Sequence, residues 1–264
     1  LRDAKGAVEY LARHDREVLA RLKEKLDFSE EEWKLWQRII DHMYFPYDEA
    51  RQVYPLDDGF MMRRPWDESR IPEEKRAWLY ENYHPLFIMR HRMSKQADAI
   101  LGMYLHSHLF TKEEIRRNYD FYQEVTLHHS SLSTCIFGIV ASDIGYDDEA
   151  YRYFSQSARM DLDDYHHNFY AGIHGANMAG TWQAVVNGFA GLRCQETRLK
   201  FSPSLPSEWE SYSFKLRYKR ALLRIGVSRG QAEFTLEEGE KITFYIGGKE
   251  ICIQENGGRH VEKI

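Results

Sequence analysis

Hydrophobic residues recur at helical spacing along the first three quarters of the chain. An apolar stripe among charged residues predicts a helix over residues 1–26. Ser29 followed by three glutamates is an N-cap signal, which predicts a second helix ending near Met43. Residues 44–84 show no such periodicity, and we expect an irregular segment there. A loop of that length in a compact domain is usually functional.

The next predicted helix carries polar residues where its pattern calls for apolar ones. Pro85 fits a first helical position, and the spacing predicts a helix that runs to about His106. Gln96 falls on the apolar face of this helix, and Lys95 lies one residue off it. Burying such groups is costly without partners, so we expect both to face a polar pocket.

Clear end signals mark the later helices. Thr111 and Glu114 form a capping-box pattern, which predicts a helix over 112–124. We expect further helices over about 131–143, over about 147–159, and from about Gly180 to Val186.

The pattern changes near residue 198 to short runs with an apolar residue at every second position, punctuated by glycines. The runs are Phe214–Tyr218, Leu223–Val227, Glu233–Leu236, Ile242–Ile246 and Ile251–Ile253. This period of two predicts a small antiparallel β domain. The fold class is therefore mainly α with a C-terminal β module, with a domain boundary between 1–197 and 198–264.

Composition narrows the kind of protein. The 264 residues suffice for one large or two smaller domains, and the net charge of −5 argues against nucleic acid or an anionic membrane as partner. The 14% aromatic content suits sugar-ring stacking, although a large aromatic core would also explain it. Cys135, Cys194 and Cys252 lie in apolar contexts without ligand spacing, so we expect buried thiols in a reducing, cytoplasmic compartment.

Two features concern the ends of the chain and membranes. The chain starts without Met inside a helical pattern, so we expect a fragment of a longer polypeptide that has lost an N-terminal part. No stretch approaches 18 consecutive apolar residues, so we expect no membrane span and no membrane partner.

Polar groups also cluster at predicted helix starts. The segment 126–133, Thr-Leu-His-His-Ser-Ser-Leu-Ser, places hydroxyls before a helix, where an anion could bind; simple N-capping is the alternative. The adjacent histidines suggest a metal only if a third ligand exists, and we expect none. His174 lies between glycines that would let a ligand approach, although it could equally be structural. The segment 161–164 is interpreted as a solvated helix end rather than an acid site.

An ordered set of short motifs covers nearly the whole chain. It comprises Phe-Pro-Tyr-Asp-Glu (45–49), Asp-Asp-Gly-Phe (57–60), Tyr-His-Pro-Leu (83–86), Lys-Gln-Ala-Asp (95–98), the segment 126–133, Ala-Arg-Met-Asp-Leu-Asp-Asp (158–164), Gly-Ile-His (172–174) and the segment 180–193. This set resembles the C-terminal part of glycoside hydrolase family 65, which includes maltose, trehalose, kojibiose and glucosylglycerol phosphorylases. The resemblance implies part of an (α/α)6 barrel followed by a β-rich domain. It also implies inverting phosphorolysis of an α-glucoside to β-glucose 1-phosphate.

The resemblance assigns roles to particular residues. It implies that Lys95 and Gln96 bind sugar, and that His174, Ser131 and Ser133 bind phosphate.

His129 and Tyr80 are further expected substrate contacts. His129 stands where the family often has an acidic residue, so the acceptor sugar is left open. The general acid, a glutamate, is expected before residue 1.

Phosphate is the expected co-substrate, with no other cofactor and no metal, and the assembly is expected to be a homodimer. The alternatives are an α-glucoside hydrolase and an inactive or carbohydrate-binding fragment. A hydrolase needs a second carboxylate as base, whereas these motifs offer an anion site.

Overall fold

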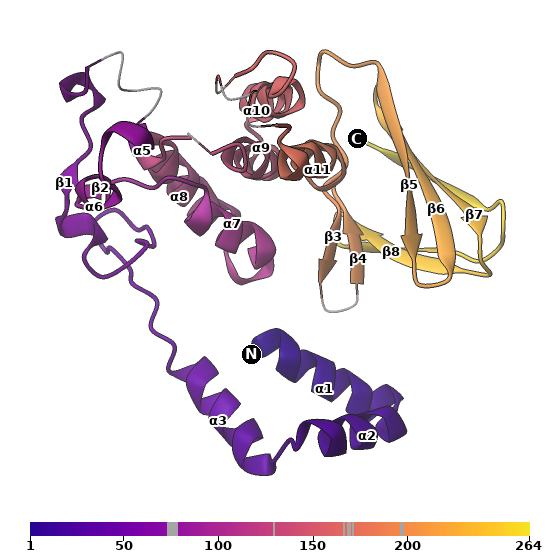
Figure 1. Cartoon of the computed structure of the whole chain (residues 1–264). Helices are drawn as coiled ribbons and strands as arrows, with labels where there is room; N and C mark the ends of the chain where they lie inside the picture. The colour runs from indigo at the N-terminus through magenta and orange to yellow at the C-terminus, as the bar shows by residue number, and fades with distance from the viewer. Residues whose placement is uncertain (73–78, 129, 166, 168–169, 171, 196–197) are drawn as a thin grey trace. The chain divides into compact units, whose positions relative to one another are not determined.

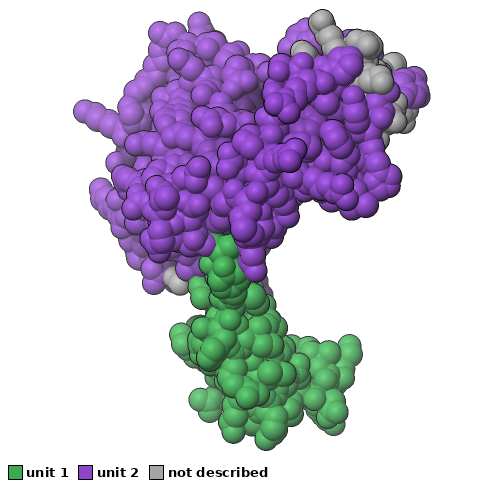
Figure 2. Space-filling view, turned by 90° about the vertical axis from the view of Figure 1, so that its left-hand side faces the viewer, with its two compact units in different colours: residues 1–46 green, residues 47–264 purple. Residues whose placement is uncertain are grey.

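The chain forms two compact units, Leu1–Pro46 and Tyr47–Ile264, which Figure 2 colours separately. A computed structural model describes residues 1–72, 79–128, 130–165, 167, 170, 172–195 and 198–264, without the side chains of residues 68, 80 and 81. Within these ranges, no helix is long and apolar enough to cross a membrane.

The first unit consists of the helices α1 (Arg2–His14), α2 (Arg16–Leu26) and α3 (Glu30–Asp41). The prediction of one helix over 1–26 is wrong, because the backbone of Asp15 is not helical (φ −155°, ψ 81°). The Asp15 carboxylate instead accepts a hydrogen bond from the Val18 N–H at 3.0 Å and so caps α2. Ser29 caps α3 as predicted, by accepting from the Glu32 N–H at 3.1 Å.

The second unit begins with the irregular segment that the sequence predicts. It contains the single turns Phe60–Met62 and Glu68–Arg70 and the two-residue strand β1 (Arg64–Pro65). The helices that follow are α5 (Leu79–Asn82), α6 (Pro85–Met89), α7 (Asp98–Leu105), α8 (Lys112–Val125), α9 (Ser133–Ile144), α10 (Asp147–Arg159) and α11 (Gly175–Gln183), and a π-helical segment, Ala184–Phe189, continues α11. Figure 1 shows α7 to α11 grouped together beside the β module.

The predicted helix over residues 85–106 is interrupted. α6 ends at Met89, strand β2 (His91–Arg92) pairs with β1, and α7 starts only at Asp98. The cause is a tertiary backbone interaction: the Ser94 N–H donates to the Val125 carbonyl at 2.7 Å, and the Leu127 N–H donates to the Ser94 carbonyl at 2.9 Å. Lys95 and Gln96 therefore lie on a loop, and the helical-face argument for them is wrong.

The β module consists of two four-stranded sheets in the described residues. One has the order β10-β7-β6-β5 and the other β3-β4-β8-β9. The strands are β3 (Arg193–Gln195), β4 (Arg198–Phe201), β5 (Ser211–Tyr218), β6 (Ala221–Ser228), β7 (Gln231–Glu238), β8 (Ile242–Ile246), β9 (Lys249–Ile253) and β10 (Arg259–Lys263). All pairings in these sheets are antiparallel except β4 with β8, which is parallel. The mainly α fold class with a C-terminal β module is confirmed, and strands β3, β4 and β10 are additions to the sequence prediction.

Each part of this unit has its own core. Tyr119, Tyr122 and Phe137 are at most 1% exposed among the helices, and Phe234 and Phe244 are fully buried between the sheets. Burial of such side chains is the main stabilising contribution.

Only one of the three cysteine thiols lies in a core. Cys135 is buried in the helical core, whereas Cys194 and Cys252 are exposed, so the expectation of three buried thiols is wrong for two of them. Both exposed residues lie on strands, where neighbouring side chains point to opposite faces.

Candidate functional site

Two of the polar segments are held side by side by backbone pairing. Ser94 and Thr126 form a parallel bridge, with the two hydrogen bonds of 2.7 and 2.9 Å described above. The Ser94 hydroxyl also donates to the Gln96 carbonyl at 2.6 Å, which turns the chain toward α7. The loop that carries Lys95 and Gln96 is thus fixed beside the start of the segment 126–133.

Close packing of α11 on α9 places the third polar segment, residues 172–174, at the same end of these helices as Ser133. Gly180 of α11 lies against Cys135 near the start of α9, where an added Cβ would be 2.6 Å from the sulfur. Gly188 lies against Ile139, further along α9, so α11 and its continuation run parallel to α9. The start of α11 at His174 and the start of α9 at Ser133 therefore lie at one end of the layer.

A buried polar pair fixes the start of α11 to the end of α10. The Ser157 hydroxyl contacts the Asn177 side-chain oxygen at 2.8 Å, and the Asn177 amide donates to the Ser157 carbonyl at 2.7 Å. Both residues are at most 2% exposed. Buried hydrogen bonds of this kind restrict the loop between the two helices, which carries Asp161.

The side chain of Asp161 holds His174 by two hydrogen bonds. One carboxylate oxygen is 2.5 Å from Nδ1 of the ring, and the other accepts from the His174 N–H at 3.0 Å. The hydrogen bond from His174 holds the pKa of the Asp161 carboxyl below its usual value. An ionised carboxylate only accepts, so Nδ1 carries the proton of this hydrogen bond. Sequence reasoning missed Asp161, because thirteen residues separate it from its partner.

The start of α9 presents buried hydroxyls. Ser133, the first residue of the helix, is 0% exposed, and Thr134 is 2% exposed. Neither hydroxyl has a hydrogen-bond partner among the residues that the structure describes. Ser131 is half-buried and precedes the helix, which begins two residues later than predicted. Buried polar groups are normally satisfied, so these hydroxyls indicate a place for an acceptor ligand.

The structure describes the surroundings of only some of the remaining predicted site residues. Lys95 is exposed and Gln96 is half-buried. His129 and the side chain of Tyr80 lie outside the described residues. His128 packs its ring on Phe137, with centroids 4.6 Å apart, so it belongs to the aromatic core.

No group of three or more His, Cys, Asp or Glu side chains in the described ranges could hold a metal ion. The arrangement at this end of the layer instead provides donors. Hydroxyls, a ring nitrogen and N–H groups in the first turn of α9 suit an oxyanion.

Comparison with known proteins identifies the class and then the family. The chain superposes on a putative kojibiose phosphorylase from the human microbiome with a TM-score of 0.83 and 28% identity, covering 99% of this chain and 36% of that one. The model of the glycosyl hydrolase family 65 central catalytic domain matches residues 4–183, and that of the family's C-terminal domain matches 192–252. The chain therefore belongs to glycosyl hydrolase family 65.

The relatives in this family are longer proteins. An alpha,alpha-trehalose phosphorylase from Thermoanaerobacter brockii is 44% identical over 88% of this chain and 30% of its own length. A maltose phosphorylase from Bacillus subtilis is 35% identical over 95% of this chain and 33% of its own length. The chain spans about a third of the length of the curated relatives it matches.

Proposed function

We propose that the full-length protein containing this chain catalyses inverting phosphorolysis of an α-glucoside. A phosphate oxygen attacks the anomeric carbon from the face opposite the glycosidic oxygen, and the glycosidic bond breaks. A glutamate outside this chain protonates the leaving oxygen. The products are β-glucose 1-phosphate and the released acceptor.

The observation that carries this proposal is the set of anion donors at the start of α9 and α11. An inverting hydrolase needs a carboxylate base to activate water. Asp161 is the carboxylate in contact with His174, but it already accepts two hydrogen bonds from that residue. A carboxylate whose pKa is lowered in this way is a poor base. The donors Ser131, Ser133 and His174 instead favour a phosphate nucleophile.

The names of the relatives also support phosphorolysis. Those with assigned names include trehalose, maltose, kojibiose and glucosylglycerol phosphorylases. We propose that Lys95 and Gln96 bind the glucosyl unit, since their loop lies beside the segment 126–133. His129 and Tyr80 remain proposed substrate contacts, and a cytoplasmic homodimer remains the proposed assembly.

The test is a screen of the full-length protein with trehalose, maltose, kojibiose and glucosylglycerol, each with and without phosphate. We expect release of β-glucose 1-phosphate only with phosphate. The His174→Ala variant should raise the phosphate KM far more than the disaccharide KM, because the ring contacts one substrate only.

Lys95→Ala should abolish turnover with the fold intact, since Lys95 is exposed and supports no core. Cleavage at the same rate without phosphate would support the hydrolase. Sugar binding without turnover would support a binding protein.

A further inference from the structure

A cleft at one end of the β module gathers positive charge. Its volume is about 650 Å³, and its walls include Arg198, Lys219, Arg220 and Lys241. The only carboxylate among the described lining residues is Glu240, so the lining carries four positive charges and one negative charge. The chain as a whole has a net charge of −5, which makes this excess of cations a local feature.

Two turns build the cleft, one within a sheet and one that connects the two sheets. The β5–β6 turn contributes Lys219 and Arg220, and the turn between β7 and β8 contributes Lys241. Gly239 in the second turn has φ +109°, and an added Cβ would lie 3.1 Å from the Cα of Ala221. A side chain at Gly239 would therefore separate the turns, and the glycine lets them touch.

The cations in the cleft differ from others on the same module. Outside it, Lys215 pairs with Glu237 at 2.6 Å and Arg217 pairs with Glu238 at 2.9 Å, in both cases between β5 and β7, which flank β6. None of the four cleft cations has a carboxylate within 4.0 Å among the described residues. Like charges held together without counter-ions attract anions from solution.

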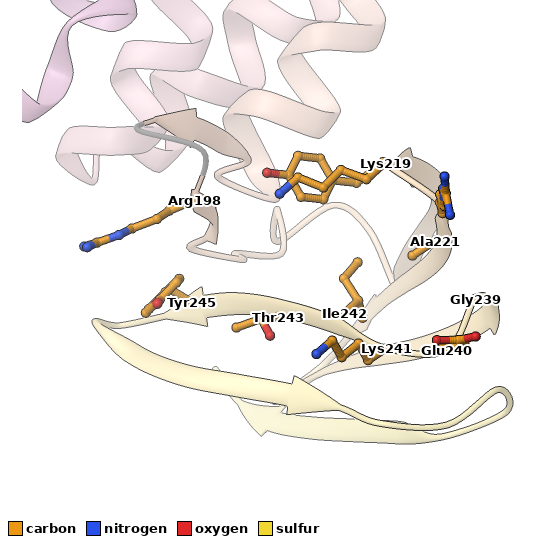
Figure 3. A pocket seen from close by; sticks show the side chains of 11 residues that line it. Arg198, Lys219, Ala221, Gly239, Glu240, Lys241, Ile242, Thr243 and Tyr245 are labelled. Carbon is orange, nitrogen blue, oxygen red and sulfur yellow. The ribbon is translucent and has the colours of Figure 1, made fainter. Parts of the chain in front are cut away.

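Aromatic rings and an apolar floor complete the walls. Tyr218 and Tyr245 are half-buried, and Lys219 lies over the Tyr218 ring with its ammonium 5.2 Å from the centroid. The floor contains Ile242, which is 4% exposed. Figure 3 shows Lys219 and Lys241 on opposite sides of the opening with Ile242 between them. The Tyr245 hydroxyl donates to Glu250 at 2.5 Å, which fixes the ring, and the guanidinium carbon of Arg198 lies over the ring 5.9 Å from its centroid.

We propose that this cleft binds a phosphorylated sugar. The phosphate contacts the ammonium groups of Lys219 and Lys241, and the sugar ring packs on a tyrosine face. The volume is in the range of small-molecule sites, and a bare anion would leave the aromatic walls uncovered. The proposal does not depend on the catalytic assignment, because none of the proposed phosphate-site residues lines the cleft.

The experiment is calorimetric titration of the full-length protein with glucose 1-phosphate and glucose 6-phosphate. His174→Ala is present throughout to weaken binding at the proposed catalytic phosphate site, and every cleft variant is compared with this same background. We expect one of the two sugar phosphates to bind. The pair Lys219→Glu and Lys241→Glu should weaken binding about tenfold or more, because two charge-assisted contacts become repulsive.

Lys263→Glu is the matched control, since it makes the same charge change on an exposed strand of the same module outside the cleft. It should leave the dissociation constant within about twofold. If the charge reversals disturb folding, Lys241→Gln gives the same direction of change with a milder substitution. Thermal melting checks each variant.

Three results would overturn the proposal. They are the absence of binding by both sugar phosphates, equal weakening by Lys263→Glu, and sulfate alone binding as tightly as the sugar phosphates. The last result would identify a general anion site without a role for the tyrosines.

Discussion

Replacing Asp161 tests whether its contact with His174 prepares the ring for phosphate. In the wild type, the ionised carboxylate keeps the proton on Nδ1. Nε2 can then donate to phosphate only when the ring is an imidazolium, so the contact with phosphate is charge-assisted. In Asp161→Asn, we expect the amide oxygen to keep accepting from the His174 N–H, which leaves the amide NH2 facing Nδ1. The ring is then held neutral, with its proton on Nε2.

The size of the effect follows from the class of hydrogen bond that changes. Hydrogen bonds to charged groups contribute about 1.5–3 kcal/mol and neutral ones about 0.5–1.5 kcal/mol. Exchanging one for the other at His174 costs about 1 kcal/mol, which corresponds to about a fivefold higher phosphate KM. Asp161→Ala removes the support for the ring as well, and losing such a supporting partner typically costs about 10–100-fold.

The assay is initial-rate kinetics of the full-length protein in the direction of phosphorolysis, with phosphate and the disaccharide each varied in turn at a fixed pH. In Asp161→Asn the phosphate KM should be about fivefold higher than in the wild type, while the disaccharide KM stays constant. A merely structural role of Asp161 would raise both KM values together, and that outcome would refute the argument.

The same contact affects stability at low pH. The pKa of Asp161 is lowered in the folded protein, so its stabilising effect is complete above the ordinary carboxyl pKa. It is lost as the pH falls through the lowered value. Acid unfolding followed by circular dichroism should therefore be less steep in Asp161→Asn than in the wild type, and an identical acid transition would contradict this.

Three further substitutions test the surroundings of the site. Ser133→Ala removes an unsatisfied buried hydroxyl, so in urea titrations it should leave the free energy of unfolding unchanged or raise it by about 1 kcal/mol. The same substitution should raise the phosphate KM. A large loss of stability would contradict this prediction. Gly180→Ala should destabilise the folded protein by about 1–3 kcal/mol, because the added methyl group overpacks the contact with α9. Gly175→Ala is the control on the same helix and should not destabilise the protein, since open space surrounds that residue. Equal effects of the two substitutions in thermal melts would refute the packing argument. Arg193→Met should destabilise by about 3 kcal/mol, because it leaves Asp143 unpaired, and adding Asp143→Asn should restore part of that loss in a double-mutant cycle.

Local signals in the sequence predicted local structure well. The capping box of α8 is present in full: the Glu114 N–H donates to the Thr111 hydroxyl at 3.2 Å, and the Thr111 N–H donates to the Glu114 carboxylate at 2.7 Å. The alternating runs of the β module also became strands, since one face of each sheet is buried in the shared core. Both signals lie within a few residues, where side chain and backbone determine each other directly.

Interactions between distant segments account for the wrong predictions. The helical period of residues 85–106 could not reveal that Ser94 pairs with the backbone of the segment after α8. Likewise, the parallel pairing of β4 with β8 joins strands about forty residues apart. In the site, the glycines around His174 marked that residue, but Asp161 had the sequence pattern of a solvated helix end. Its role depends on the turn between α10 and α11, which no short pattern encodes.

The buried hydroxyls at the start of α9 link stability to function in this fragment. Ser133 and Thr134 lie in a well-packed helix whose other buried positions are filled by apolar side chains, so alanine or valine would fit there. An unsatisfied buried hydroxyl costs about 1–3 kcal/mol, and this cost persists only where something else compensates for it. An oxyanion at this position would accept hydrogen bonds from the hydroxyls, from the N–H groups of α9 and from Nε2 of His174. If phosphate binds here as we propose, the stability that these hydroxyls cost the protein is regained on binding, which is the relation expected of a binding site rather than of a helix cap.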